Sequence, residues 1–280
     1  MSKNVINIRR AVFVMLFLCV LSPVFYIYFK YSSHYERRDG VLYQDVIPRN
    51  AEPLRKAGAR FSRKSLYVPD GMQKKREMNF LWFESFSKER ASDTYPLVVV
   101  LHGSTGYSYA ADYLSVYDIT QQYPAYILVP MAPAYTSWSG RSLFSWAPPE
   151  LPHVVSLINA LSERYPIDKK RIYVIGCSMG GYGVFYAAKE YSDIFAAGVS
   201  ISGAWDEEDA KNMRGLPLYI MAGKRDKAVP YERTAKMAEA IAGYGGDVQF
   251  SAFNMGHNCP SSHYYTRAVW RWMFSKTLDE

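Results

Sequence analysis

The sequence contains few of the residues that usually form metal sites. Only three cysteines and five histidines occur among its 280 residues, and no Cys/His or carboxylate cluster has the spacing of metal ligands. His257 and His263 come closest to a ligand pair, but no further ligand accompanies them at a suitable spacing. We therefore expect no bound metal.

The sequence also lacks internal repeats, low-complexity tracts and any long insertion. Its length suits one large α/β domain with a terminal extension and is too short for two large domains. Apolar residues make up 49% and charged residues 21%, as in ordinary globular proteins. Because no long insertion is present, no separate lid domain is expected.

The main body of the chain lacks a positive net charge. The net charge of +7 comes from residues 1–76, whose balance is +10, whereas residues 77–280 have a balance of −3. A nucleic-acid enzyme would carry positive charge around its binding face, so we expect no nucleic-acid partner. A basic N-terminal segment suits anionic lipid headgroups, and it suits a solvated linker equally well.

One stretch, residues 11–29, contains no charged residue and is mostly apolar. A helix of that length, at about 1.5 Å per residue, nearly matches a hydrocarbon core of roughly 30 Å. No A-x-A-like cleavage site follows it, and Leu18 is too large for a lipoprotein motif at Cys19. These features predict an uncleaved transmembrane signal anchor.

The flanking Lys and Arg residues do not decide the orientation of this anchor. A short N-terminal tail usually stays in the cytosol, so we expect the rest of the chain on the extracytoplasmic, periplasmic side. The predicted organisation is a tail at residues 1–10, an anchor at 11–30, a basic linker at 31–60 and a folded domain at 61–280.

Within the folded domain, short apolar runs alternate with helical patterns. The runs lie at residues 66–68, 79–83, 96–101, 125–129, 171–176, 196–201, 217–222 and 247–252. The helical patterns occupy residues 149–164, 180–190, 231–243 and 263–275. This alternation predicts an α/β fold with a mostly parallel eight-stranded sheet and helices on both faces. Ligands of such sheets bind at the carboxyl ends of the strands.

The strongest motif is G-C-S-M-G at residues 176–180, which follows an apolar run and precedes a helical pattern. A G-x-S-x-G turn in this context exposes its serine above the sheet as a nucleophile, and the glycines permit the tight turn. The dipole of the following helix favours a developing negative charge. Ser178 is therefore the candidate nucleophile, and a plain small-residue turn between strand and helix is the alternative.

The partners of such a serine follow it in the order acid, then histidine. Asp226 comes just after the run at 217–222, and Asp206, one strand earlier, is the rival acid. Among the histidines, only His257 is on a glycine-flanked loop after the last predicted strand, where the triad histidine is expected. We predict Ser178, Asp226 and His257 as a catalytic triad. The alternatives are a capping or surface role for Asp226 and a surface-loop role for His257.

The segment L-H-G-S-T-G at residues 101–106 follows another apolar run. A loop in this position supplies one N–H group of an oxyanion hole, so the backbone N–H groups of Ser104 and Met179 are the candidate donors. His102 is expected to brace the loop without transferring a proton. The segment lacks the G-K-[ST] ending of a phosphate-binding loop.

Together these motifs resemble a known family. The motifs L-H-G-x-x-G, G-C-S-M-G-G-Y-G, F-A-A-G-V-S-I-S-G, G-x-x-D-x-x-V-P and G-H are similar to those of the esterase and polyhydroxybutyrate-depolymerase-like branch of the α/β-hydrolases. Bacterial predicted peptidases related to the prolyl oligopeptidases are similar too. The resemblance covers residues 61–275 and implies the α/β-hydrolase fold with Ser178, Asp226 and His257 as the triad. It does not fix the substrate, because esterases and peptidases of this fold share these motifs.

An aromatic segment, residues 133–149, lies between a predicted strand and a predicted helix. Its side chains Trp138, Phe144 and Trp146 are candidates for a substrate-binding wall, and packing of the loop against the domain is an equal alternative. The expected reaction is hydrolysis of a carboxylic ester through an acyl-enzyme, which needs no cofactor. The alternatives are a serine peptidase with the same machinery and a non-catalytic binding protein of this fold.

Two of the three cysteines flank the predicted triad: Cys177 precedes Ser178, and Cys259 lies two residues after His257. If the serine and histidine approach to roughly 3 Å, these cysteines can come within the disulfide range of about 4.4–6.8 Å between Cα atoms. Tannases and fungal feruloyl esterases are similar in bridging a cysteine before the serine to one after the histidine, although Asn258 intervenes here. Two unconnected buried thiols are the alternative. A disulfide would indicate an oxidising compartment.

Overall fold

The structure, a computed structural model, describes residues 61–70, 74–86, 93–106, 108–115, 117–141 and 148–278. The predicted tail, anchor and linker at residues 1–60 lie outside these ranges. No helix within them is long and apolar enough to cross a membrane.

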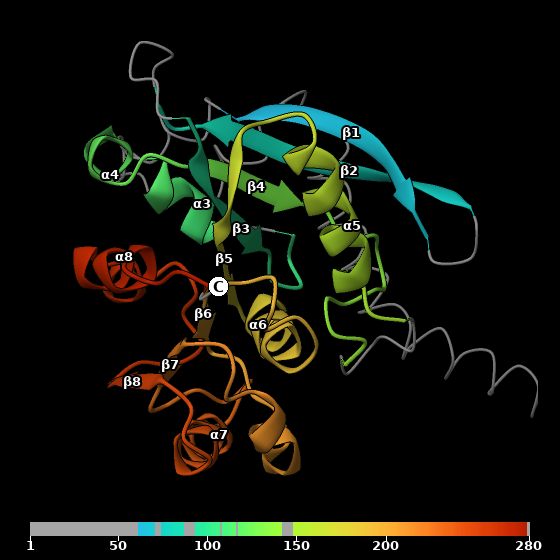
Figure 1. The fold of residues 1–280 in the computed structure, drawn as a ribbon. Coiled ribbons are helices and arrows are strands. Elements are labelled where there is room, and N and C mark those ends of the chain that lie inside the picture. Colours follow the sequence, from blue (N-terminus) through green and yellow to red (C-terminus); the bar gives the residue numbers. More distant parts are fainter. Residues whose placement is uncertain are drawn as a thin grey trace, which may run out of the picture. The chain divides into compact units, whose positions relative to one another are not determined.

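The described residues build one eight-stranded sheet with helices on both faces (Figure 1). The strands lie in the order β1-β2-β4-β3-β5-β6-β7-β8. Their bounds are β1 (Ser62–Pro69), β2 (Lys75–Glu84), β3 (Tyr95–Leu101), β4 (Tyr126–Pro130), β5 (Ile167–Cys177), β6 (Ala197–Ile201), β7 (Leu218–Gly223) and β8 (Val248–Phe253). β2 is antiparallel to both β1 and β4, and every later pair is parallel, so the predicted mostly parallel sheet is confirmed.

Helices connect the parallel strands. Their bounds are α3 (Tyr109–Leu114), α4 (Tyr117–Gln122), α5 (Leu151–Ser162), α6 (Met179–Glu190), α7 (Tyr231–Gly243) and α8 (Arg267–Phe274), with short 3₁₀ helices η1 (Glu207–Asn212) and η2 (Ser262–Tyr264). α3 and α8 cover one face of the sheet, and α5 and α6 cover the other (Figure 1). α7 packs on β7 and β8.

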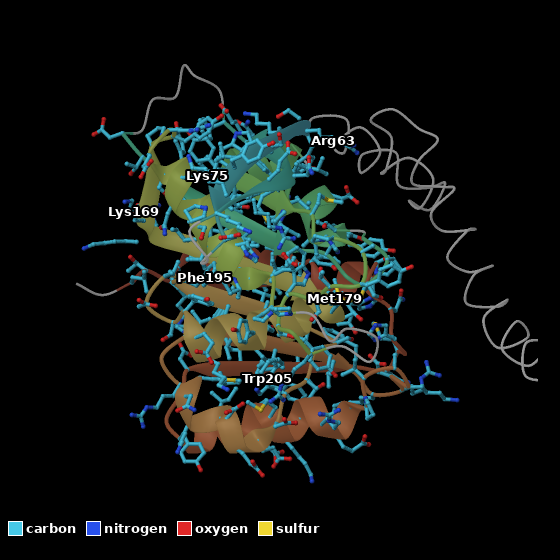
Figure 2. All side chains as sticks on the ribbon, turned by 90° about the vertical axis from the view of Figure 1, so that its right-hand side faces the viewer. Arg63, Lys75, Lys169, Met179, Phe195 and Trp205 are labelled. Carbon is cyan, nitrogen blue, oxygen red and sulfur yellow. A yellow bond between two sulfur atoms is a disulfide. The ribbon has the colours of Figure 1, made fainter. Side chains whose placement is uncertain are left out.

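The burial of each strand follows its residue pattern. β3 and β4 are apolar throughout, and every residue in them is buried, as expected for central strands covered on both faces. β1 lies at the sheet edge, begins with four polar or charged residues and is mostly exposed. The buried apolar side chains fill the space between the sheet and its helices (Figure 2).

Several elements differ from the prediction in their bounds or were not predicted. β1 begins at Ser62 and β5 at Ile167, both earlier than the apolar runs at 66–68 and 171–176, since residues 62–65 and 168–171 are polar. The six-residue helices α3 and α4 were not predicted, because fewer than two turns show no clear helical period. α8 begins at Arg267 and not at residue 263, because residues 262–264 form η2.

Candidate active site

Ser178 lies in the sharp turn between β5 and α6, and its backbone has the angles φ 57° and ψ −118°. Positive φ is uncommon for residues other than glycine, and such strain is concentrated at functional turns. The N–H of Ser178 donates a hydrogen bond of 2.9 Å to the carbonyl of Ile201, the last residue of β6. The neighbouring strand therefore holds the serine in place at the carboxyl edge of the sheet.

Gly176 and Gly180 allow this turn because each lies against backbone. A Cβ on Gly176 would come within 2.5 Å of the Gly180 carbonyl, and a Cβ on Gly180 within 2.1 Å of the Leu101 carbonyl oxygen. No side chain fits at either position without moving the backbone. The two glycines thus let α6 start directly above the ends of β3 and β5.

Asp226 and His257, predicted from separate loops, lie together. The Asp226 Oδ2 and the His257 Nδ1 are 2.7 Å apart. The other carboxylate oxygen, Oδ1, accepts N–H hydrogen bonds of 2.9 Å from both Ala228 and Val229. The side chain of Asp226 is almost entirely buried, whereas that of His257 is 25% exposed. This arrangement fixes the imidazole through Nδ1 and leaves Nε2 for a proton-transfer partner.

The loop that carries His257 is held against the end of β7. A Cβ on Gly223 would lie 2.5 Å from the Met255 carbonyl oxygen and 2.6 Å from that of Gly256, so only glycine permits this approach. Arg225 adds two contacts: its N–H donates to the Met255 carbonyl at 2.9 Å and its Nη2 to that of Asn254 at 2.8 Å. The acid and histidine loops therefore form one connected unit.

Ser178 and His257 line one pocket of about 210 Å³. Gly103 and Ser104 of the loop after β3 line it as well. A Cβ built on Gly103 would lie 3.9 Å from the Ser178 Cβ, so this loop borders the nucleophile turn. Met179 is the first residue of α6, where helix N–H groups have no intrahelical partner. The predicted oxyanion donors at Ser104 and Met179 thus belong to the two segments that meet at Ser178.

His102 braces the loop after β3, as its sequence position suggests. The N–H of Ala132 donates to its Nε2 at 3.0 Å, which requires Nε2 to be unprotonated, and Nδ1 donates to the Gly103 carbonyl at 2.7 Å. The imidazole is therefore neutral. Burial lowers the pKa of His102 to about 4, although the hydrogen bond to Gly103 acts in the opposite direction. His102 connects the loops after β3 and β4.

A disulfide joins Cys177 and Cys259, whose Cα atoms are 5.9 Å apart. The intervening Asn258 does not prevent this pairing. The bond connects the residue before Ser178 to the loop just after His257, and both cysteines line the pocket. It therefore fixes covalently the separation of the two chain segments that carry the predicted nucleophile and base.

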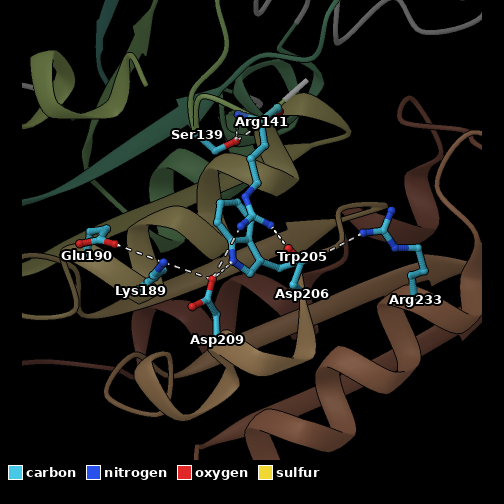
Figure 3. Close-up of polar contacts among 8 residues, drawn as sticks. All are labelled: Ser139, Arg141, Lys189, Glu190, Trp205, Asp206, Asp209 and Arg233. Carbon is cyan, nitrogen blue, oxygen red and sulfur yellow. Dashed lines mark hydrogen bonds and ion pairs between the residues drawn. The ribbon is translucent and has the colours of Figure 1, made fainter. Parts of the chain in front are cut away.

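Asp206, the rival acid, lies elsewhere. Its half-exposed carboxylate forms ion pairs with Arg141 and with Arg233, the latter at 3.5 Å (Figure 3). The Arg141 guanidinium lies 4.2 Å from the ring centroid of Trp205, whose Nε1 donates to Asp209. Asp206 thus belongs to a surface charge cluster, and Asp226 is the aspartate that contacts His257.

The aromatic segment does not form the expected binding wall at Trp138. This side chain has no exposed surface, and its Nε1 donates to the His102 carbonyl at 2.8 Å. A Cβ on Gly183 would lie 2.6 Å from its Cβ, so it packs beneath α6 in the core. The substrate role predicted for Trp138 is therefore wrong, because the indole is buried beneath the site. Phe144 and Trp146 lie outside the described residues.

Two tyrosines that the sequence analysis did not single out hold the loop after His257. Tyr265 donates its hydroxyl proton to the Cys259 carbonyl at 2.8 Å, and Tyr113 donates to that of Pro260 at 3.2 Å. Their rings stack with centroids 4.5 Å apart. Burial raises the pKa of Tyr265 well above its usual value, so its hydroxyl remains a donor. The sequence carried no signal for Tyr113, because α3 itself was not predicted.

Comparison with known proteins shows similarity to hydrolases. A model of the dienelactone hydrolase family matches residues 150–268, which include Ser178, Asp226 and His257. A solved thermostable esterase has a TM-score of 0.69 and 25% identity, and the match covers 78% of this chain and 64% of that one. The described domain has the α/β-hydrolase fold, which is consistent with the α/β-hydrolase superfamily.

Two curated proteins match shorter segments. Feruloyl esterase B of Neurospora crassa is 30% identical over 114 residues, which cover 38% of each chain. A bifunctional acetylxylan esterase/xylanase of Neocallimastix patriciarum is 30% identical over 80 residues, or 29% of this chain and 12% of that protein. The chain thus matches much less than half the length of either curated relative.

The neutral state of His102 predicts how stability varies with pH. The folded pKa of about 4 lies below the usual 6.5 of the unfolded chain, so the unfolded state gains a proton first as pH falls. The contribution of His102 to the free energy of unfolding is complete well above pH 6.5 and is lost progressively as the pH falls to 4. When the pH is lowered from 7 to 5, protonation of this histidine in the unfolded chain should reduce the free energy of unfolding by about 2 kcal/mol. Urea denaturation at the two pH values measures this change.

The variant His102→Gln serves as control, because it removes the titrating ring and keeps a polar side chain. Its unfolding free energy should fall less than that of the wild type over the same pH interval. An identical pH dependence in the two proteins would show that His102 titrates normally in the folded state.

Proposed function

We propose that the chain is a serine hydrolase that cleaves carboxylic esters, with Ser178 as nucleophile, His257 as general base and Asp226 as the orienting acid. The proposal rests chiefly on the 2.7 Å contact between Asp226 and His257, in a pocket that His257 shares with Ser178. The nucleophile turn, the acid and the histidine follow β5, β7 and β8, so all three are at the carboxyl edge of the sheet.

In the first half of the reaction, His257 Nε2 takes the proton of Ser178 as Oγ attacks the ester carbonyl. Asp226 holds Nδ1 protonated and stabilises the imidazolium that forms. The N–H groups of Ser104 and Met179 stabilise the oxyanion of the tetrahedral intermediate, a contribution of about 3–4 kcal/mol for each such donor. His257 then protonates the departing alcohol, and the acyl group remains on Ser178.

In the second half, water replaces the alcohol. His257 takes a proton from the water as the water oxygen attacks the acyl carbonyl. When the tetrahedral intermediate collapses, His257 donates that proton to the departing Ser178 Oγ. The acid product leaves, and the triad is restored. The side chain of His257 is one-quarter exposed, so it has direct access to solvent for this step.

The preference for esters is supported by the relatives. The two curated relatives and the thermostable esterase all carry ester hydrolysis in their names. Because the chain covers 12%, 38% and 64% of their lengths, this support concerns the chemistry and not a particular substrate. A serine peptidase would use the same residues, so ester and amide substrates must be compared directly.

Replacing Ser178 with alanine should lower kcat for a short aryl ester by roughly 10⁴–10⁶-fold, because the nucleophile is lost. The wild type should react covalently with a fluorophosphonate probe, and the variant should not. Circular dichroism should show the variant folded. Near-wild-type turnover by Ser178→Ala would remove this serine from the mechanism, and faster cleavage of a matched peptide amide would favour the peptidase.

Replacing Asp226 with asparagine should lower kcat by about 10⁴-fold, because the imidazole loses the partner that fixes its tautomer. The matched control is Asp206→Asn, which removes a carboxylate from the exposed ion pairs with Arg141 and Arg233. That variant should keep kcat within a fewfold of the wild type. If Asp206→Asn loses about 10⁴-fold in kcat and Asp226→Asn changes only a fewfold, Asp206 is the acid.

We further propose that residues 11–30 anchor the protein in a membrane, with the hydrolase domain on the extracytoplasmic side. The uncharged run at 11–29 supports the anchor. The disulfide between Cys177 and Cys259 supports the location, because such bonds persist mainly in oxidising compartments.

The full-length protein should remain in the membrane pellet after a high-salt wash, and a variant lacking residues 1–31 should be soluble and retain activity. The reason is that the anchor carries no catalytic group, whereas the hydrophobic run resists extraction by salt. Quantitative release of the full-length protein by salt alone would contradict the anchor and indicate binding by charge.

A further inference from the structure

The two edges of the sheet differ in how their outer strands are protected. β1 forms one edge and β8 forms the other (Figure 1). β1, with the sequence SRKSLYVP, carries Arg63 and Lys64 and ends in Pro69. β8, with the sequence VQFSAF, contains neither a charged residue nor a proline. Charged residues and proline on an edge strand oppose its pairing with another chain, so β8 lacks the protection that β1 has.

The backbone groups on the outer side of β8 are unpaired. The carbonyls of Asp247 and Phe253, at the two ends of β8, each accept an N–H hydrogen bond of 2.8 Å from the β7 side. Because backbone groups alternate in direction along a strand, the odd-numbered residues face β7 and the even-numbered residues Val248, Phe250 and Ala252 face outward. Within the part of the chain that the structure describes, nothing bonds to these outward N–H and C=O groups.

The side chain at the middle of this edge is apolar and exposed. Phe250 is 37% exposed, and its ring centroid lies 6.1 Å from that of Tyr231 at the start of α7. No residue of β8 is buried, whereas β7 beside it is buried at five of its six positions. An exposed aromatic residue on an unprotected edge is typical of a strand that pairs with another strand.

The sequence of β8 is complementary to itself in an antiparallel arrangement. If Phe250 lies opposite Phe250 of a second copy, Val248 lies opposite Ala252, and all the outward N–H and C=O groups find partners. The facing side chains on that side of the sheet are then all apolar. On the other side Gln249 lies opposite Ser251, so polar residues meet, and no like charges are opposed.

We propose that two copies of this protein associate through β8, which joins their sheets across a two-fold axis at Phe250. Such an interface uses the same surface on both copies, as in most homodimers. The inference does not depend on the proposed hydrolysis. Because the paired strands run antiparallel, the carboxyl edges of the two sheets point in opposite directions. Neither copy therefore covers the predicted catalytic residues of the other.

The first test is a disulfide across the axis, formed in the full-length protein in detergent micelles. A Cys19→Ser background removes the remaining thiol, because Cys177 and Cys259 are bonded to each other. Opposed residues in a hydrogen-bonded antiparallel pair have Cα atoms about 5.5 Å apart, which suits a disulfide. Phe250→Cys should therefore give a covalent dimer on a non-reducing gel after mild oxidation. The matched control is Tyr67→Cys on β1, which should stay monomeric although Tyr67 is 63% exposed.

The second test opposes two like charges at the axis. Phe250→Lys should raise the dissociation constant of the dimer by about tenfold or more, measured by light scattering and ultracentrifugation of the full-length protein in micelles. Tyr67→Lys adds the same charge to the opposite edge of the sheet and should remain as dimeric as the wild type. Circular dichroism should show both variants folded, because both side chains are exposed.

Equal crosslinking at positions 67 and 250 would overturn the proposal, because it would indicate random collision. Absence of a crosslink at position 250 would overturn it as well. If Phe250→Lys associates as strongly as the wild type, the copies pair through another segment and the assignment of β8 is wrong. A wild type that is monomeric at every concentration tested would also contradict the proposal, and it would leave the proposed hydrolysis unaffected.

Discussion

The geometry of the site depends on backbone hydrogen bonds that continue the parallel ladder one residue beyond the strands. Ser178 donates to the carbonyl of Ile201 at 2.9 Å, Ser202 to that of Met221 at 2.8 Å, and Lys224 to that of Phe253 at 2.8 Å. Each loop therefore starts from a point fixed by the next strand in the sheet. Ligand sites at the carboxyl edge of parallel sheets rely on this kind of fixed starting point.

Close packing and side-chain contacts then determine how the loops of the site lie relative to one another. Glycines at 176, 180 and 223 let segments approach at distances that no Cβ would allow. His102 connects the loops after β3 and β4 through both ring nitrogens, while Asp226 uses one oxygen for backbone N–H groups and the other for His257. Since each group has a defined partner, the predicted oxyanion loop and the acid–histidine pair have little freedom to shift relative to Ser178.

The sequence was most informative where chemistry requires a fixed residue at a fixed place in the chain. The turn at Ser178, the position of Asp226 after β7 and the glycine-flanked His257 could all be recognised from motif and strand order. Contacts between distant segments could not be derived in this way. The sequence left substrate binding and loop packing as equal alternatives for Trp138, and only the fold shows that α6 covers it.

The disulfide between Cys177 and Cys259 encloses a ring of the chain, because the two residues are 82 positions apart. The ring contains α6, β6, β7, α7 and β8, and with them Ser178, Asp226 and His257. A single proteolytic cut between residues 178 and 258 would produce two fragments that remain covalently attached beside the site. After such a cut, the two fragments would separate only once the disulfide is reduced. The disulfide therefore holds the predicted catalytic residues together even when the chain between them is cleaved.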